Sequence, residues 1–193
     1  MSNEEQKKIV QFLFEMGTMR KLPRMHRQVL LTDDVSDTIA THSYRVTLIG
    51  WFLAKMEGVD PYKVLMMCLS HDMSEVRTGD HNWVHKRYIK VFEDEVRTDQ
   101  LGSLPFEELN DISEEYHERK SPEAIVAKDA DLLDQILLLR EYIWQGNKEA
   151  EAWLKRKNIE DTFKTKSAKE LVKKMLSEDP SSWQRELQTS INR

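Results

Sequence analysis

The sequence has few of the residues that cross-link a chain or break regular structure. Cys68 is its one cysteine, so neither an intrachain disulfide nor a thiolate cluster can form. Because Cys68 lies in the apolar run Val64–Leu69, it is expected to be a buried structural thiol. Six glycines and five prolines are too few for a turn-rich all-β fold.

Long hydrophobic runs and a strong excess of one charge are also missing. No apolar stretch approaches the ~20 residues of a membrane span, and the N-terminal residues Ser2–Glu5 lack the cationic start of a signal peptide. We therefore expect a cytoplasmic protein without membrane contact. The net charge of −5 argues against a nucleic-acid polymer as partner. A small phosphorylated substrate stays possible, because a metal or local basic residues can supply positive charge.

Hydrophobic periodicity predicts an all-α fold with one domain over residues 1–193 and no convincing strand. Apolar residues on nearly every side of 36–57, 61–77 and 122–145 indicate central helices. The more polar segments 86–100 and 105–120 are expected to be surface helices. Lys21–Thr38 is expected to be irregular, 148–157 is short and charged, and Ser167–Glu170 has the form of a capping box.

Four polar residues stand inside or at the end of these apolar helices: His42, His71, Asp72 and Asp131. A buried carboxylate is costly without a partner, and two imidazoles with two carboxylates suit one borderline divalent ion. Taken singly, each residue has a plainer explanation, such as a core histidine or an aspartate paired with a lysine. The order and spacing of all four favour a metal site.

That order resembles the H…HD…D signature of the HD-domain superfamily. The strings around it, including HDMSEVRTGD at 71–80 and KDAD at 128–131, look like its 5′-deoxynucleotidase (YfbR-like) branch. The resemblance covers about residues 9–147 and leaves the C-terminal helices of 148–193 undiagnosed. It implies a helical bundle around one divalent ion (Mn, Co, Mg, Zn, Fe or Ni). It also implies a homodimer, with Trp153 and Trp183 as candidates for its interface.

Glu75 and Asp80 are the candidate catalytic residues. If the helix continues past His71, Glu75 lies one turn further on the same face, within reach of a metal-bound water but outside the ligand set. A helix-surface acid paired with Arg77 is the alternative. Asp80 follows a Thr-Gly turn and would ordinarily be a turn residue. The resemblance implies that it contacts the sugar, at the 3′-hydroxyl.

Several positions depart from the pattern of similar nucleotidases. The prolines expected after Thr-Gly-Asp are absent, and the first loop lacks a tryptophan. Arg24 or Arg27 is the candidate phosphate-binding arginine of that loop, and Lys86 matches a lysine that could hold a phosphate. His81 and His85 are extra imidazoles that are either surface residues or ligands of a second metal.

The sequence therefore predicts a metal-dependent phosphohydrolase acting on nucleotides, and foremost a deoxyribonucleoside 5′-monophosphatase. The first alternative is a triphosphohydrolase that releases triphosphate from a deoxynucleoside triphosphate, using the basic residues near 20–27 and 86–90. The second alternative is a non-catalytic helical protein with a structural metal, which would have no open water position.

Overall fold

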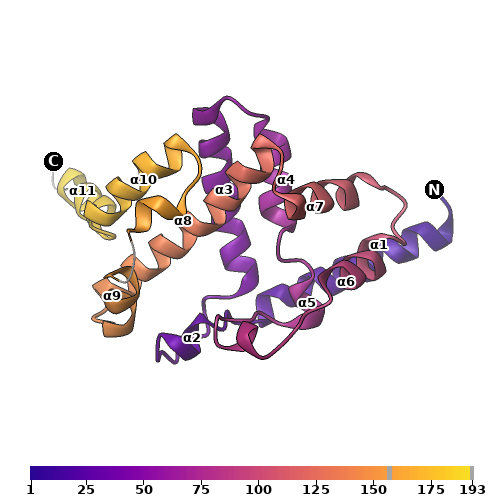
Figure 1. The fold of residues 1–193 in the computed structure, drawn as a ribbon, viewed down its shortest axis with the longest axis horizontal. Helices are drawn as coiled ribbons and strands as arrows, with labels where there is room; N and C mark the ends of the chain where they lie inside the picture. The colour runs from indigo at the N-terminus through magenta and orange to yellow at the C-terminus, as the bar shows by residue number, and fades with distance from the viewer. Residues whose placement is uncertain (156–157, 192–193) are drawn as a thin grey trace.

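The computed structural model describes residues 1–155 and 158–191. Three helices cross at its centre, namely α3 (Ile39–Glu57), α4 (Pro61–Ser70) and α8 (Pro122–Trp144) (Figure 1). Within the described ranges there is no strand, and the one β-type pairing is an isolated bridge between Pro23 and Thr38. The predicted all-α fold is confirmed.

The ends of the central helices follow from local sequence chemistry. The Asp60 side chain accepts hydrogen bonds from the first backbone N–H groups of α4, and Pro61 occupies the first turn, where no N–H partner is needed. Ser121 and Pro122 start α8 in the same way. Helix α3 ends at Gly58, whose φ of 73° is the left-handed conformation that glycine adopts without strain.

The core forms where α3, α4 and α8 meet. Its largest side chains without solvent exposure include Leu53 of α3, Met67 of α4 and Leu133 of α8. Phe163 and Val172, from the segment that leads into α10 and from α10 itself, close the core from the C-terminal side. Because these helices are buried on several faces, they have the continuous apolar sequences that predicted a central position.

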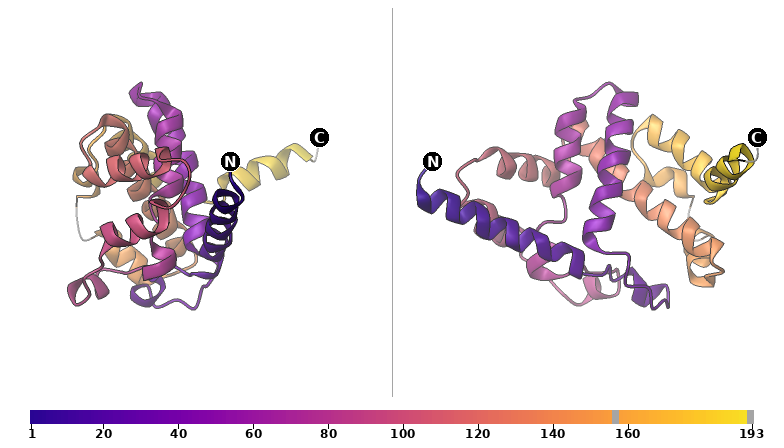
Figure 2. Two further views of the ribbon diagram at one scale, coloured as in Figure 1. Left: turned by 90° about the vertical axis from the view of Figure 1, so that its right-hand side faces the viewer. Right: turned by 180° about the vertical axis from the view of Figure 1, so that it is seen from behind.

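The remaining helices lie on the two sides of this centre (Figures 1 and 2). On one side are α1 (Asn3–Met16), α5 (Glu75–Thr78), α6 (Glu93–Leu101) and α7 (Glu108–Glu118). On the other side are α9 (Lys148–Lys155), α10 (Lys166–Ser177) and α11 (Ser182–Ile191), and α11 projects away from the body. Short helical turns, η1 (Gly17–Lys21), α2 (His26–Val29), η2 (His85–Arg87) and η3 (Ile159–Thr162), join these elements.

The predicted continuous helix over 61–77 is wrong. Helix α4 ends at Ser70, a turn follows, and α5 begins only at Glu75. At the break the ring of His71 hydrogen-bonds through Nδ1 to the carbonyl oxygen of Cys68, at 2.8 Å. A side chain that bonds to the preceding turn competes with the helix ladder. The turn therefore changes the direction in which Asp72 and Glu75 project.

Two further helix boundaries differ from the prediction. The segment 86–100 is α-helical only from Glu93 onward and begins with the 3-10 turn η2, because Asn82 holds this loop by accepting from the backbone N–H groups of residues 84 and 85. The capping box expected at Ser167–Glu170 is not formed. Thr165 caps α10 instead, and the N–H of Ser167 donates to Glu57 of α3. Positions 156 and 157, the end of the charged segment 148–157, lie outside the described residues.

Within the described ranges, every helix is too short or too polar to cross a lipid bilayer.

Gly50 is where α3 and α4 approach most closely. A Cβ atom at this position would lie 2.5 Å from Cys68 Sγ and 3.1 Å from a methyl group of Val64. Gly50→Ala is therefore expected to lower the free energy of unfolding by about 1–3 kcal/mol through overpacking. Urea titration measures this loss. The double variant Gly50→Ala/Cys68→Ala should recover part of it, and strict additivity of the two changes would contradict the packing explanation.

Candidate metal centre

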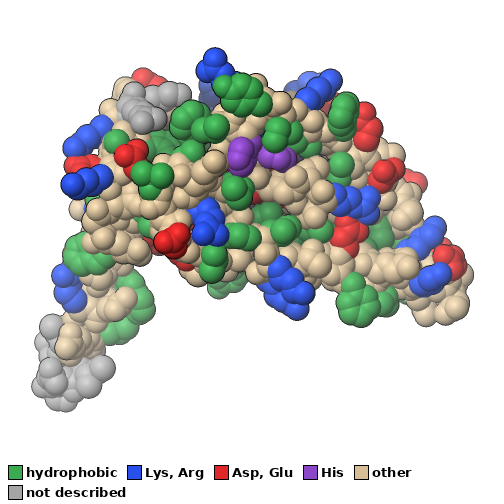
Figure 3. Space-filling view, turned by 90° about the horizontal axis from the view of Figure 1, so that it is seen from below, with side chains coloured by type: hydrophobic (Ala, Val, Ile, Leu, Met, Phe, Trp, Pro, Cys, Tyr) green, Lys and Arg blue, Asp and Glu red, His purple; other side chains and the backbone are tan. Residues whose placement is uncertain are grey.

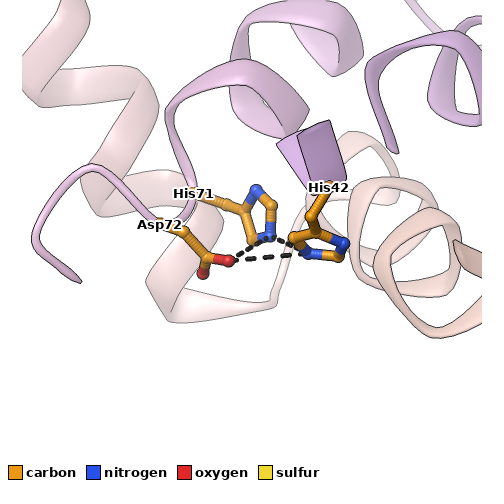
Figure 4. A group of neighbouring side chains, drawn as sticks. All are labelled: His42, His71 and Asp72. Carbon is orange, nitrogen blue, oxygen red and sulfur yellow. Dashed lines mark hydrogen bonds and ion pairs between the residues drawn. The ribbon is translucent and has the colours of Figure 1, made fainter. Parts of the chain in front are cut away.

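The four predicted ligands come together from three helices. His42 lies on α3, Asp131 lies on α8, and the turn after α4 supplies His71 and Asp72. Donor atoms of His42, His71 and Asp72 all lie within 4.8 Å of one another (Figure 4). The Nε2 atoms of the two histidines are 3.2 Å apart, and Asp131 Oδ1 is 3.3 Å from His42 Nε2. Asp131 is not part of the group whose donor atoms all lie within 4.8 Å, but its carboxylate borders the cluster, 3.3 Å from His42 Nε2 and 3.9 Å from His71 Nε2.

Both histidines are held with Nε2 directed into the cluster. His71 donates from Nδ1 to the carbonyl oxygen of Cys68, and His42 Nδ1 lies 2.6 Å from Asp134 Oδ2. A proton on Nδ1 leaves the lone pair of Nε2 free, which is the state a metal ligand needs. Arg24 Nη1 also lies 2.6 Å from His42 Nδ1. A guanidinium can only donate, so Nδ1 would have to accept from Arg24 but donate to Asp134, and only one of these hydrogen bonds can form. We assign the proton to His42 Nδ1, which donates it to the Asp134 carboxylate.

The electrostatics of the cluster favour a cation. Burial and Arg24 lower the pKa of His42, but the carboxylates of Asp131 and Asp134 outweigh them and raise it to about 9. Burial alone would raise the pKa of Asp131, but its contacts with His42 and Lys128 hold it well below its usual range. Without a metal, the cluster takes up a proton on His42. A divalent ion would supply the same positive charge in place of that proton, so the cluster fits a metal.

Three aspartates on α8 have three different partners. Asp131 faces the cluster, and Asp134, three positions further on the same helix face, orients His42 and pairs with Arg45. Asp129 points elsewhere and accepts hydrogen bonds from the backbone N–H groups of residues 164 and 165, which ties the start of α10 to α8. Only one of the three carboxylates is therefore placed as a metal ligand.

A cavity of about 260 Å³ opens beside the cluster and brings the other candidate residues together. Its wall includes both proposed catalytic carboxylates, Glu75 and Asp80, next to His71, Asp72 and Asp131. Burial, with Asp72 and Asp80 nearby, raises the pKa of Glu75 to about 10. Glu75 is thus a half-buried carboxyl group on the cavity wall, and the alternative pairing with Arg77 is not formed, because Arg77 pairs with Glu15.

Asp80 lies at the point where the chain leaves α5. Gly79 before it has a φ of 78° and a ψ of 158°, a conformation that glycine adopts without strain. The chain turns there, and Asp80 lines the cavity. Its Oδ2 accepts a hydrogen bond from the backbone N–H of Met25, at 2.5 Å. This bond joins the first loop to the segment after α5, and it leaves the second carboxylate oxygen for another partner.

The basic candidates divide into those that line the cavity and those that do not. Arg24 and Lys86 line it, and Arg24 is buried within 3.6 Å of Asp134. Arg27 is absent from the cavity wall. His81 lies on the wall, 5.8 Å from the ring of His85, but in the described part of the chain no third ligand joins them in a metal group.

Sequence reasoning did not identify several residues that shape this site. Asp134 could have been found from its i, i+3 spacing to Asp131. Lys128 lines the cavity and lies 2.6 Å from Asp131 Oδ2. Arg119 also lines it, with a φ of 56° and a guanidinium 3.3 Å above the ring of Tyr116. Its Nη1 atom is buried without a hydrogen-bond partner. Nothing in the local sequence distinguishes Arg119 from a surface arginine.

Proteins named 5′-deoxynucleotidases are similar to this chain in sequence. The 5′-deoxynucleotidase HDDC2 of Dictyostelium discoideum is 29% identical over 141 residues, which are 66% of this chain and 72% of that protein. A 5′-deoxynucleotidase of Photobacterium profundum is 26% identical over 170 residues, which are 79% of this chain and 86% of that protein.

Solved structures share the arrangement of helices. A conserved hypothetical protein from Pyrococcus furiosus superimposes with a TM-score of 0.70 at 26% identity, covering 86% of this chain and 98% of that one. A predicted metal-dependent phosphohydrolase from Magnetospirillum magnetotacticum gives a TM-score of 0.62 at 22% identity, covering 89% and 93%. Residues 19–177 match the HD domain family. The chain belongs to that family.

Proposed function

We propose that this protein hydrolyses deoxyribonucleoside 5′-monophosphates to a deoxynucleoside and phosphate. One observation carries the proposal: a single cavity is lined by His71, Asp72 and Asp131 of the cluster, by the half-buried Glu75 and by Asp80 on the Thr-Gly-Asp turn. The 5′-deoxynucleotidase names of similar proteins support the same activity.

In this proposal one divalent ion (Mn, Co, Mg, Zn, Fe or Ni) is held by His42, His71, Asp72 and Asp131. When bound, such an ion polarises a phosphoryl group and lowers the pKa of water. Asp134 and the Cys68 carbonyl oxygen keep both imidazoles in the ligating tautomer.

The protein's own groups would then position the phosphate and move one proton. Four cationic side chains face the cavity from separate segments, so the phosphate would meet positive charge on several sides. They are Arg24 of the first loop, Lys86 of η2, Arg119 at the end of α7 and Lys128 of α8. Water forms the new bond to phosphorus as the bond to the 5′-oxygen breaks. Glu75 takes the proton from water and delivers it to the departing 5′-oxygen.

A triphosphohydrolase is the second candidate, because four cationic side chains exceed what one phosphate needs. A non-catalytic metal protein is less compatible with Glu75 and Asp80 in the same cavity. The test is a nucleotide panel assayed with Mn²⁺, Co²⁺ and Mg²⁺ for both phosphate and triphosphate. Phosphate from deoxynucleoside monophosphates supports the proposal. Intact triphosphate from triphosphates favours the second candidate, and metal content without turnover favours the third.

Deoxyribonucleotides are expected to be better substrates than ribonucleotides. One carboxylate oxygen of Asp80 accepts the hydrogen bond from Met25, and in the proposed complex the other accepts one from a sugar hydroxyl. The cavity would then also have to accommodate the additional 2′-hydroxyl of a ribonucleotide. We expect kcat/KM for dAMP to exceed that for AMP by about 10- to 100-fold. Steady-state kinetics on the pairs dAMP/AMP and dGMP/GMP measure the ratio, and equal values would refute deoxyribose selection.

We also propose that the protein forms a homodimer through the outer face of α3. Tyr44, Leu48, Phe52 and Met56 recur at every fourth position there, and all are exposed. An apolar stripe of this kind on a lone chain indicates an interface. Of the tryptophans named for this role, Trp183 is exposed, whereas Trp153 lines a cavity.

The replacement Phe52→Glu is expected to shift the protein from dimer to monomer, because two charges would face each other across the symmetric contact. Sedimentation velocity measures the mass in solution. Val10→Glu on the exposed face of α1 is the control and should leave the mass unchanged. A wild-type monomer, or a dimer that survives Phe52→Glu, would rule out this interface.

A further inference from the structure

A second cavity of about 400 Å³ lies next to the first one. Leu132 and Gln135 of α8 belong to the walls of both cavities. The rest of its lining is mostly apolar and includes Trp83, Ile136, Trp153 and Phe163. Figure 3 shows the underside of the molecule, where histidine side chains reach the surface beside hydrophobic ones. The two cavities are therefore neighbouring compartments, one polar and one apolar.

The two tryptophans link this apolar cavity to the candidate active site. Trp83 comes three positions after Asp80, on the loop that Asn82 fastens to the first loop. Trp153 packs edge-on against the ring of His26, with 5.4 Å between centroids, and His26 lines the polar cavity. Trp83 is thus close in sequence to Asp80, and Trp153 is in contact with His26, and both Asp80 and His26 line the polar cavity.

Helix α8 sets the distance between the two compartments. An α-helix rises about 1.5 Å per residue, so Ile136 and Leu139 lie roughly 7–12 Å along the axis from Asp131. A nucleoside monophosphate whose phosphate is at the cluster, and whose sugar is at Asp80, would project its base by a comparable length. The apolar cavity lies along that helix, with Leu132, Gln135, Ile136 and Leu139 in its wall, so it is within reach of such a base.

We propose that this apolar cavity binds the heterocyclic base of the nucleotide. The base stacks on the aromatic side chains of Trp83 and Trp153, and the amide of Gln135, between the two cavities, hydrogen-bonds to its edge. Stacking tolerates any base, because every base has a π-face. An amide can both donate and accept, so Gln135 does not restrict the site to one base. The inference rests on the proposed nucleotidase function and names the part of the protein that distinguishes a nucleotide from a sugar phosphate.

The kinetic test compares dAMP with 2-deoxyribose 5-phosphate, which has the same phosphate and sugar but no base. Trp83→Ala and Trp153→Ala are each expected to raise KM for dAMP by about five- to 100-fold, the range of a lost base–aromatic stack. KM for 2-deoxyribose 5-phosphate should stay within about twofold. Trp144→Ala is the matched control, because Trp144 and Trp83 are both 57% exposed and Trp144 lies outside the cavity.

Binding without turnover gives the second readout. In a Glu75→Ala background, dAMP should quench tryptophan fluorescence, and the quench should fall when Trp83 is replaced by phenylalanine, with affinity largely retained. 2-Deoxyribose 5-phosphate should leave the fluorescence unchanged. Thermal unfolding of each variant identifies any that fails to fold, and the fluorescence of the Trp83→Phe protein still tests the stack if an alanine variant does so.

The outcomes separate this inference from the proposed function. If wild-type protein releases no phosphate from any deoxynucleotide and dAMP does not bind, the proposed function itself fails. If deoxynucleotides turn over but the tryptophan variants affect dAMP and 2-deoxyribose 5-phosphate equally, the cavity does not hold the base. Turnover of dAMP without any change in tryptophan fluorescence would likewise overturn the inference and point to another apolar occupant.

Discussion

Replacing Glu75 with alanine is expected to lower kcat by about 10²- to 10⁴-fold while the protein keeps its metal and its fold. Glu75 lines the cavity beside Asp72 and Asp80, and in the proposed function it acts on water rather than as one of the four ligands. Its loss therefore removes a proton carrier and no ligand. Nucleotide affinity should change little, because the missing interaction belongs to the transition state.

The raised pKa of Glu75, about 10, indicates how this group would respond to a cation. Burial is its main cause, followed by the negative charges of Asp72 and Asp80. A divalent ion held by Asp72 offsets that negative charge and so favours the ionised form of Glu75. Metal loading should therefore convert Glu75 from a neutral acid into a base at neutral pH.

Three measurements on one preparation test the role of Glu75: metal content, nucleotide affinity and kcat. Glu75→Gln, which has the same shape but cannot ionise, should lose as much activity as Glu75→Ala. Glu93→Ala is the control, because Glu93 is an exposed glutamate on the wall of the same cavity. Loss of the metal with Glu75 would make it a ligand. An unchanged kcat would mean that another group, such as Asp80 or His81, transfers the proton.

The variants Asp131→Ala and His71→Ala are expected to lose the metal and, with it, measurable turnover. In the proposed site Asp131 and His71 would each supply one of four ligands, so removing either would leave the remaining charges of the cluster without a common partner. Asp134→Asn should be milder, with metal affinity reduced by about 10- to 100-fold, because it weakens only the contact that orients His42. Full metal occupancy in the His71→Ala and Asp131→Ala proteins would contradict the ligand assignment.

Metal affinity should also depend on pH in a defined direction. The folded, metal-free protein carries a proton on His42 up to about pH 9, and that proton must leave before Nε2 can bind a metal. Each unit of pH below 9 should therefore weaken apparent metal affinity by about tenfold for this one proton. Calorimetry in buffers of different ionisation enthalpy counts the released protons. Asp134→Asn removes a carboxylate that raises the pKa of His42, so in this variant the metal affinity should stop depending on pH at a lower pH.

Local chemistry in the sequence is sufficient for most of the helices and for the choice of ligands. Asp60-Pro61 and Ser121-Pro122 start helices here because capping depends on neighbouring residues alone. Polar residues within apolar helices must be compensated, so the sequence context of His42 and Asp131 is enough to indicate a site. The break after Ser70 is not predictable in this way, since it depends on how the His71 side chain bonds to the turn before it.

The sequence by itself determined the all-α class and the family, and it indicated the residues of the candidate metal site, because these follow from periodicity, capping and a specific motif. Only the tertiary structure decided which charges meet. It directed Asp129 to α10 and Asp134 to His42, brought Arg119 and Lys128 to the cavity, and kept Arg27 away from it. The physical reason is that a motif fixes spacing along the chain, whereas the direction of each side chain is set by helices packed from distant parts of the sequence.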